Sequence, residues 1–278
     1  MIIVEQEAIL LIALIIGTIT DIRKREVPNY VSFSLIAVAG MLALLKSGMQ
    51  GSFTPLITAL YGLAIAVGIG LLMYYAGQWG GGDAKILFGV GLLLGFSPSL
   101  TDHLFLFLVY ALISGGILGF VWMIAVGFSS WKETKKKYAE LRSLQKNMVL
   151  LARIAGITCI IIAAFLVKIN YLFSLLAIFI GIGTYILVYL SLFVRAVEDQ
   201  MKKKISVLKL EEGDWLVNDV TVTGKLITAK SKTGLSLEDI AHLKRAGVSE
   251  VVVRQGVPFV PAFLAAEILV LTLGNPFM

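Results

Sequence analysis

Charged residues divide this chain into long uncharged stretches, in place of the short alternation of polar and apolar positions found in soluble proteins. A membrane's hydrocarbon core, about 30 Å thick, is crossed by about 20 residues of helix. We therefore interpret eight stretches as transmembrane helices, with six or seven spans as the main competing count because several uncharged cores are short. The stretches are Ala8–Thr20, Val27–Leu45, Ser47–Gly82, Ile86–Thr101, His103–Trp131, Ile154–Val167, Ile169–Val194 and the tail from Pro258, which is interrupted at Glu267.

The composition supports the same class. Hydrophobic residues make up 58% of the 278 residues and charged residues 15%, against about 25% charged residues in soluble domains. The sequence thus predicts an all-α polytopic membrane protein. With a single cysteine, Cys159, the chain cannot form an intrachain disulfide or a CxxC metal site, and we predict neither a bound metal nor a cofactor.

The net charge of +6 records membrane topology. If the loop after the first span is cytoplasmic, all of the 24 Lys and Arg residues except Lys46 and Lys168 fall on the cytoplasmic side, as the positive-inside rule requires. We therefore expect a multi-pass protein of the cell membrane with its N-terminus outside. The basic residues do not predict nucleic-acid binding.

The charged segments also suggest a division into domains. Spans one to seven occupy residues 1–194 and include a basic connector at 129–151. Residues 195–257 form a cytoplasmic insertion, and residues 258–278 contain the last span. The connector, with its run WKETKKKYAELRSLQKN, is predicted to be a helix on or near an anionic membrane surface, and we favour a solvated charged connector over an interaction surface.

The insertion is long enough for a small α+β module. The alternating run VNDVTVTGKLITAK predicts a hairpin with its turn at Gly224. In SLEDIAHLKRAG, Ser236 and Asp239 have the spacing of a capping box, which predicts a helix start. The run SEVVVR predicts one more strand.

Ionisable residues at or within membrane spans are costly and are therefore candidates for function. Asp21 ends the first span and Asp83 precedes the fourth, so the topology places both at the cytoplasmic face. Neither His103 nor His242 shows a partner pattern. The remaining candidates are Lys85, which we expect to mark a cytoplasmic end, Asp102, and Glu267, which is either functional or a buried hydrogen-bonded group.

Two neighbouring aspartates can share one proton, because both cannot ionise at close range. The ionised one can activate water as a general base, while the other protonates a leaving amine. The structural alternatives are that Asp21 belongs to an interfacial charge cluster and that Asp83 only caps a helix. The glycines Gly80, Gly81 and Gly82 before Asp83 would let an extended substrate backbone approach.

The runs TDIRKREVPN around Asp21 and GGGDAKIL around Asp83 resemble the type IV prepilin peptidase family, above all its archaeal preflagellin peptidase branch. The late run GVPFVPAFLAAEILV is similar to the tail of archaeal members. These are intramembrane aspartyl proteases with a GxGD sequence. The resemblance implies that Asp21 and Asp83 are the catalytic pair. It also implies that the substrates are prepilin- or preflagellin-like precursors with a short basic leader, and that the enzyme acts in contact with membrane lipid. Because the chain has no CxxC pair, we predict no zinc and no methylation activity.

Three alternatives stay open at this point, of which one is a non-catalytic membrane scaffold that acts through its cytoplasmic module. The chain could be a presenilin-like GxGD protease. In presenilin-like proteases, however, the first aspartate belongs to the span directly before the GxGD helix, whereas Asp21 lies in the first span of this chain. The chain could instead be an ion- or proton-coupled transporter that uses Asp21, Asp83 and Glu267, although we see no internal repeat. The sequence does not predict an oligomeric state.

Overall fold

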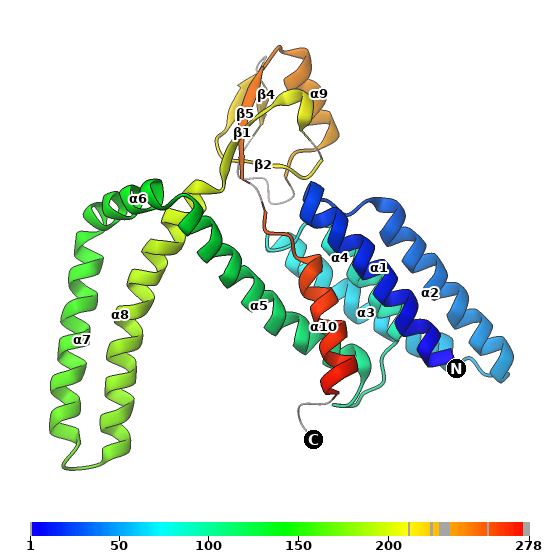
Figure 1. Ribbon diagram of the computed structural model, residues 1–278, viewed down its shortest axis with the longest axis horizontal. Coiled ribbons are helices and arrows are strands. Elements are labelled where there is room, and N and C mark those ends of the chain that lie inside the picture. Colours follow the sequence, from blue (N-terminus) through cyan, green and yellow to red (C-terminus); the bar gives the residue numbers. More distant parts are fainter. Residues whose placement is uncertain (1, 211, 223–224, 228–233, 255, 275–278) are drawn as a thin grey trace. The chain divides into compact units, whose positions relative to one another are not determined.

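The computed structural model describes residues 2–210, 212–222, 225–227, 234–254 and 256–274, and these are mainly helical (Figure 1). They form two compact units, one from Met1–Val121 with Lys203–Met278 and one from Trp122–Lys202. The helices are α1 (Ile2–Lys24), α2 (Asn29–Gln50), α3 (Thr54–Tyr75), α4 (Gly81–Leu94), α5 (His103–Ser129), α6 (Trp131–Leu144), α7 (Lys146–Leu166), α8 (Tyr171–Gln200), α9 (Leu237–Arg245) and α10 (Val260–Leu273). The strands are β1 (Lys202–Ser206), β2 (Trp215–Leu216), β3 (Val220–Val222), β4 (Lys225–Ile227) and β5 (Glu250–Arg254).

The helices confirm a multi-pass membrane protein. Within the described part of the chain, five helices are long and apolar enough to cross a bilayer: α2, α3, α5, α7 and α8. Each of the eight predicted stretches contains or overlaps a helix, but α4 and α10 have only 14 residues each, which is about 21 Å of helix. The count of eight spans therefore stays a prediction.

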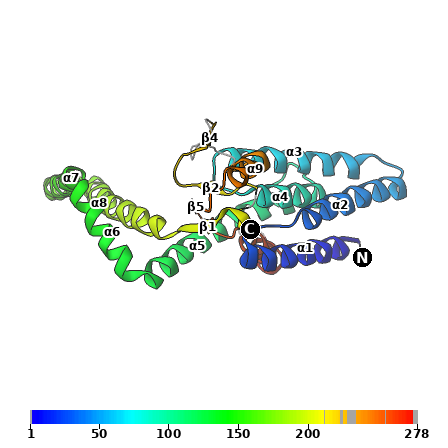
Figure 2. The same cartoon turned by 90° about the horizontal axis from the view of Figure 1, so that it is seen from above.

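Helix α4 occupies the middle of the first unit, packed between α2 and α3 (Figure 2). Small residues allow this close approach. A methyl group at Gly91 would lie 2.3 Å from the Cβ atom of Ala66, and one at Gly89 would lie 2.7 Å from the side chain of Leu35. Close contact between small residues is a typical way to pack helices in a membrane, where hydrophobicity does not drive helices together.

Helix α10 brings the end of the chain back into the first unit. It packs on α1, and the Oγ atom of Ser114 in α5 donates a hydrogen bond of 3.1 Å to the carbonyl oxygen of Ala262. Phe263 and Phe107 are fully buried in the same apolar core. Residues more than 200 positions apart in the sequence therefore meet at α10.

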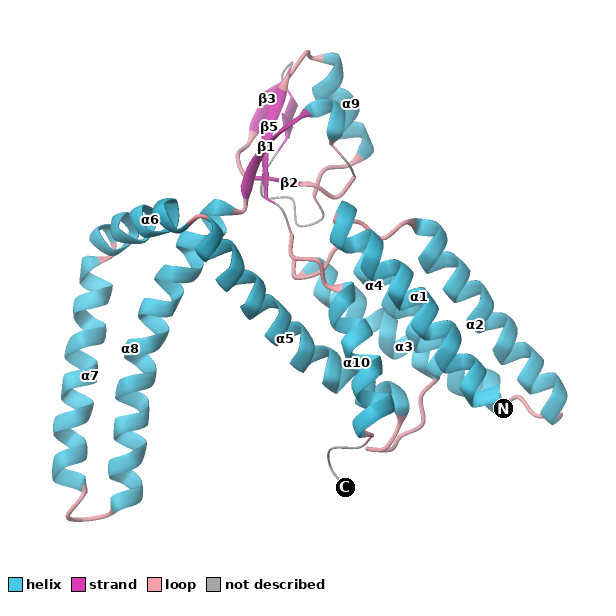
Figure 3. Ribbon diagram, viewed as in Figure 1, coloured by secondary structure: helices cyan, strands magenta, loops and turns pink. Residues whose placement is uncertain are grey.

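Residues 203–254 contain the predicted strands and helix (Figure 3). Strands β3 and β4 form an antiparallel hairpin, and β1, β5 and β2 form a three-stranded sheet in that order. The capping box of Ser236 and Asp239 begins α9. These elements confirm the predicted hairpin and helix, whereas Gly224, the predicted turn, lies outside the described residues. The division at 194 and 257 stays a prediction.

The segment has an apolar core of its own, beneath α9 and the sheet. This core contains Val207, Leu210, Leu216, Ile227, Leu235, Ile240, Leu243, Val251 and Val253.

The second unit consists of the end of α5 and of α6, α7 and α8. The predicted connector helix corresponds to α6, which is short and charged. Helices α7 and α8 pack side by side, with Gly181 against Cys159 and Gly156. Away from this seam, most of their apolar side chains are exposed.

Candidate functional site

Asp21 lies one turn before the end of α1 and is 4% exposed. Its Oδ2 atom accepts a hydrogen bond of 3.0 Å from the backbone N–H of Val260, the first residue of α10. Phe259 supplies a second backbone donor to the same carboxylate. The first N–H groups of a helix have no partner within the helix and carry a partial positive charge, so Asp21 caps α10 from a distant part of the chain.

Asp83 occupies the first turn of α4 and is 9% exposed. Its Oδ2 atom accepts a hydrogen bond of 3.0 Å from the backbone N–H of Gly80, the N-cap residue. This is one half of a capping box; the other half cannot form because glycine has no side chain. Asp83 therefore does stabilise the start of its helix, as the structural alternative supposed.

The fold buries both aspartates, and the two helices that carry them, α1 and α4, are in contact. The negative charge of Asp21 acts on the Asp83 carboxyl group, although 61 residues of sequence separate them. Both carboxyl groups are buried, and each lies at the N-terminus of a helix that donates backbone hydrogen bonds. A proton shared between them would relieve the repulsion of two buried negative charges.

Aromatic contacts connect the two halves of this site. Trp79, directly before the glycines, is 4% exposed. Its ring lies 5.0 Å from that of Phe259 and 5.3 Å from that of Phe263, measured between centroids. The segment that leads into Asp83 thus packs on the segment that donates hydrogen bonds to Asp21.

The three glycines differ in what surrounds them. A methyl group at Gly82 would lie 3.0 Å from the Cβ atom and 3.2 Å from the backbone nitrogen of Val27, so this glycine lets α4 approach the loop after α1. Gly80 and Gly81 have room for a methyl group, at 3.4 Å and 3.8 Å from their nearest neighbours. Of these three glycines, only Gly82 is needed for a close approach between two parts of the chain.

Lys85 points to a different partner from Asp83. Its Nζ atom donates a hydrogen bond of 2.9 Å to the Oδ1 atom of Asn29, at the start of α2. Asn29 belongs to the Pro28–Asn29 pair that follows Asp21 in the sequence. Lys85 therefore joins the two sequence motifs of the site by fastening α4 to α2.

Glu267 is fully buried in α10, and both its oxygens lie near His103 at the start of α5: the Nε2 atom is 3.2 Å from Oε1 and 3.1 Å from Oε2. His103 therefore has a partner in the structure that no sequence pattern indicates. The two residues are 164 positions apart, and no local spacing could reveal the pair. Glu267 is not placed at the Asp21 carboxylate; its contact holds α10 to α5.

Sequence reasoning also missed Arg25 and Trp79. The Nη1 atom of Arg25 donates a hydrogen bond to the carbonyl oxygen of Gly256, which ties the end of α1 to the segment before α10. In the sequence, Arg25 is one of three consecutive basic residues and looks like part of a membrane-boundary cluster. Its left-handed backbone, with φ of 60°, marks it only once the structure is known.

Among the residues that the structure describes, no group of three or more His, Cys, Asp or Glu side chains could hold a metal ion. The chemistry offered by this site is that of two buried carboxyl groups and backbone N–H donors.

Comparison with known proteins agrees with the sequence motifs. Residues 8–124 match the model of the Type IV leader peptidase family. A preflagellin peptidase of Methanococcus voltae is 39% identical over 87 residues, which is 31% of this chain and 37% of that protein. A preflagellin peptidase of Methanococcus maripaludis (strain C6 / ATCC BAA-1332) is 32% identical over 83 residues, 30% of this chain and 36% of that protein.

The predicted resemblance to the prepilin and preflagellin peptidase family is therefore confirmed. The matched part spans little more than a third of either relative. No solved structure matches the chain significantly. None of these matches favours the transporter or the presenilin-like alternative.

Proposed function

We propose that this protein, which shares the pattern of the type IV leader peptidase family over residues 8–124, is an intramembrane aspartyl endopeptidase. Its substrates are prepilin- or preflagellin-like precursors, whose short basic leader it removes at the cytoplasmic face of the cell membrane. The observation that carries the proposal is the burial of both Asp21 and Asp83, with the charge of Asp21 acting on the Asp83 carboxyl group.

The two aspartates have separate roles in the reaction. Asp21 accepts two backbone N–H donors and Asp83 accepts one, so Asp21 is the better stabilised anion. Asp21 therefore removes a proton from water, and the water oxygen attacks the carbonyl carbon of the scissile peptide bond. Asp83 carries the shared proton, polarises the carbonyl oxygen and protonates the amine when the C–N bond breaks.

Helix α10 positions the base. Its N-terminal amides hold the Asp21 carboxylate, its aromatic residues pack on Trp79, and Glu267 binds it to α5 through His103. Glu267 and Trp79 are therefore positioning residues. Gly80 and Gly81, where a methyl group would fit without overlap, lie where the extended substrate chain approaches Asp83.

The decisive experiment measures cleavage of a preflagellin-like precursor in membranes by Asp21→Asn and Asp83→Asn variants. Each variant should cleave at least about 10²-fold more slowly, because general acid–base catalysis contributes about 10²–10⁴-fold. Asparagine keeps a hydrogen-bond acceptor for the Val260 and Gly80 amides, so the fold should persist. Wild-type cleavage by either variant would contradict the proposal.

Asp102 provides the matched control. Its two carboxylate oxygens accept hydrogen bonds from the backbone N–H groups of Ser97 and Phe105, at 2.8 Å and 3.2 Å. Asp102→Asn thus removes one charge from a capping aspartate in the same unit, and it should leave cleavage within about threefold of wild type. An equal loss in all three variants would indicate a general effect of charge removal on the fold.

A further inference from the structure

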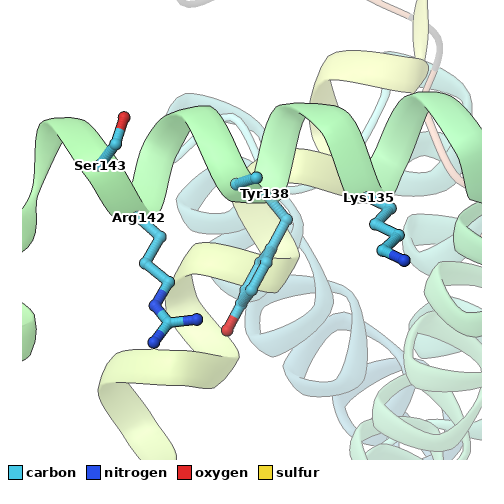
Figure 4. Close-up of a pocket in the computed structure, with 5 residues that line it drawn as sticks. Lys135, Tyr138, Arg142 and Ser143 are labelled. Carbon is cyan, nitrogen blue, oxygen red and sulfur yellow. The ribbon is translucent and has the colours of Figure 1, made fainter.

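A surface hollow of about 480 Å³ lies along α6, lined by Lys135, Tyr138, Ala139, Arg142 and Ser143 (Figure 4). Residues three, four and seven positions apart share a face of a helix. In Figure 4 the side chains of Lys135, Tyr138 and Arg142 extend to the same side of α6. The hollow thus has two cationic groups with a phenol between them.

Beside Arg142, one of the residues that line this hollow, α7 and α8 place a second cation and a tyrosine. The Nε atom of Arg153 in α7 donates a hydrogen bond of 3.0 Å to the Oη atom of Tyr189 in α8. The guanidinium carbon of Arg142 lies 6.0 Å from the centre of the same Tyr189 ring, which in turn packs on Tyr185 at 4.6 Å. Two guanidinium groups therefore converge on one tyrosine from different helices, and an anion between them would offset their mutual repulsion.

The surface beside this cluster is apolar. On α7, the first turns carry the exposed side chains of Leu150, Leu151, Ile154 and Ile157, which are 52–66% exposed. Arg153 lies among them. A ligand that meets the arginines and also covers these residues must combine an anionic head with long apolar chains.

The chain's connectivity places the cluster at the depth of lipid headgroups. Helix α6 directly joins α5 to α7, and both of these are long and apolar enough to cross a membrane. Two consecutive spans joined by a short helix leave that helix at one membrane face. Arg, Lys and Tyr side chains are favoured at this interface, where their apolar stems lie in the bilayer and their polar tips reach the headgroups.

We propose that Lys135, Tyr138, Arg142 and Arg153 form a binding site for an anionic phospholipid. Its phosphate group accepts hydrogen bonds from the two guanidinium groups, the ammonium group and the phenol, and its acyl chains lie along the exposed face of α7. Planar guanidinium groups bind phosphate oxygens in pairs, which gives such contacts both strength and direction. The site serves to hold α6 on the membrane surface and is independent of the peptidase reaction.

Native mass spectrometry of the full chain in detergent tests the site. Phosphatidylglycerol is titrated against the wild type, an Arg142→Gln/Arg153→Gln variant and a Lys132→Gln/Lys136→Gln control, which loses the same two charges outside the hollow. The first variant should retain bound phosphatidylglycerol at least about tenfold less well, since two charge-assisted hydrogen bonds are lost. The control should stay within about twofold of wild type. Equal retention by both variants would overturn the proposal.

Three further arms identify the ligand. Lys135→Gln, a change on an exposed side chain, should also weaken retention and does not depend on the helix contacts of Arg153. Phosphatidylcholine should be retained at least about tenfold less well than phosphatidylglycerol by the wild type. Inorganic phosphate at millimolar concentration should not displace the lipid. Retention of both lipids alike, displacement by phosphate, or an unchanged Lys135→Gln variant would each contradict an anionic phospholipid site.

Discussion

Helices α4 and α8 are both apolar, but they differ in how much of their surface is buried. Nine of the 14 residues of α4 are buried, including Asp83. Only five of the 30 residues of α8 are buried, and these are mainly small or aliphatic. Both helices are mainly apolar and rich in Leu, so hydrophobicity alone does not distinguish them, although four of the 14 residues of α4 are Gly against two of the 30 in α8. Protein surrounds α4, whereas α8 presents its apolar side chains to lipid.

The contrast explains where chemistry can occur. A carboxyl group within a membrane is tolerated when protein donors satisfy it, and the first unit supplies such donors from helix N-termini. The α7–α8 pair offers apolar side chains over most of its length. Of its described polar contacts, the Arg153–Tyr189 hydrogen bond lies toward α6 and the Ser174–Ala163 hydrogen bond lies near the turn between the two helices. The first unit is therefore the scaffold of the proposed peptidase site, and the second unit is a membrane-contacting element.

The largest effect on stability is expected at the seam between α3 and α4. A methyl group at Gly62 would lie 2.1 Å from the carbonyl oxygen of Gly91, whereas one at Gly68 in the same helix would meet nothing within 4 Å. Gly62→Ala should lower the free energy of unfolding by about 3 kcal/mol, because overpacking forces the backbones apart. Gly68→Ala should not lower it. Unfolding by SDS titration in detergent measures both, and equal stabilities would show that the seam is not tight.

A smaller loss is expected at the buried pair of α10 and α5. Glu267→Leu removes the acceptor of His103 and should lower the free energy of unfolding by about 2 kcal/mol, since a partly buried donor loses its partner. Glu267→Gln keeps an acceptor and should cost less than half of that. The same titration distinguishes them. If the leucine variant were as stable as the glutamine variant, the pair would not anchor α10.

The α7–α8 seam should respond less than the α3–α4 seam. A methyl group at Gly181 would lie 2.6 Å from the Cβ atom of Cys159, and one at Gly183 would meet nothing within 4 Å. Gly181→Ala should cost about 1 kcal/mol, because two helices exposed to lipid can separate slightly without disturbing a core. Cleavage of a precursor should stay unchanged in both variants. A large loss of cleavage in Gly181→Ala would mean that the second unit takes part in catalysis.

The smallest effect is expected at Lys85. Its hydrogen bond to Asn29 is exposed, so Lys85→Met should lower the free energy of unfolding by about 0.5 kcal/mol and change cleavage by less than about threefold. Lys24→Met, which removes an exposed charge from the last residue of α1, is the control. A loss of cleavage comparable to that of Asp83→Asn would give Lys85 a part in the reaction.

Local patterns predicted much of this architecture. Uncharged stretches predicted the apolar helices, and the spacing of Ser236 and Asp239 predicted the start of α9. The residues around Asp21 and Asp83 carried the family resemblance. In each case the signal lies within a few consecutive residues, where backbone hydrogen bonding and hydrophobicity act.

The partners of the site residues could not be predicted in this way. Nothing near Asp21 indicates Val260 as its hydrogen-bond donor, and nothing near His103 indicates Glu267. Arg25, which donates a hydrogen bond to Gly256, also cannot be told apart in the sequence from the basic residues directly before it. These contacts join positions more than 160 residues apart, and a single sequence contains no record of distances.

The sequence by itself determined that this is a multi-pass membrane protein with two aspartate motifs, because charge and hydrophobicity act residue by residue. Only the tertiary structure decided that α10 closes over Asp21 and that α4 is surrounded by protein while α8 is exposed. Packing depends on which surfaces meet, and two helices that are both mainly apolar meet different surroundings. Burial, which decides how two carboxyl groups share charge, is a property of that assembly.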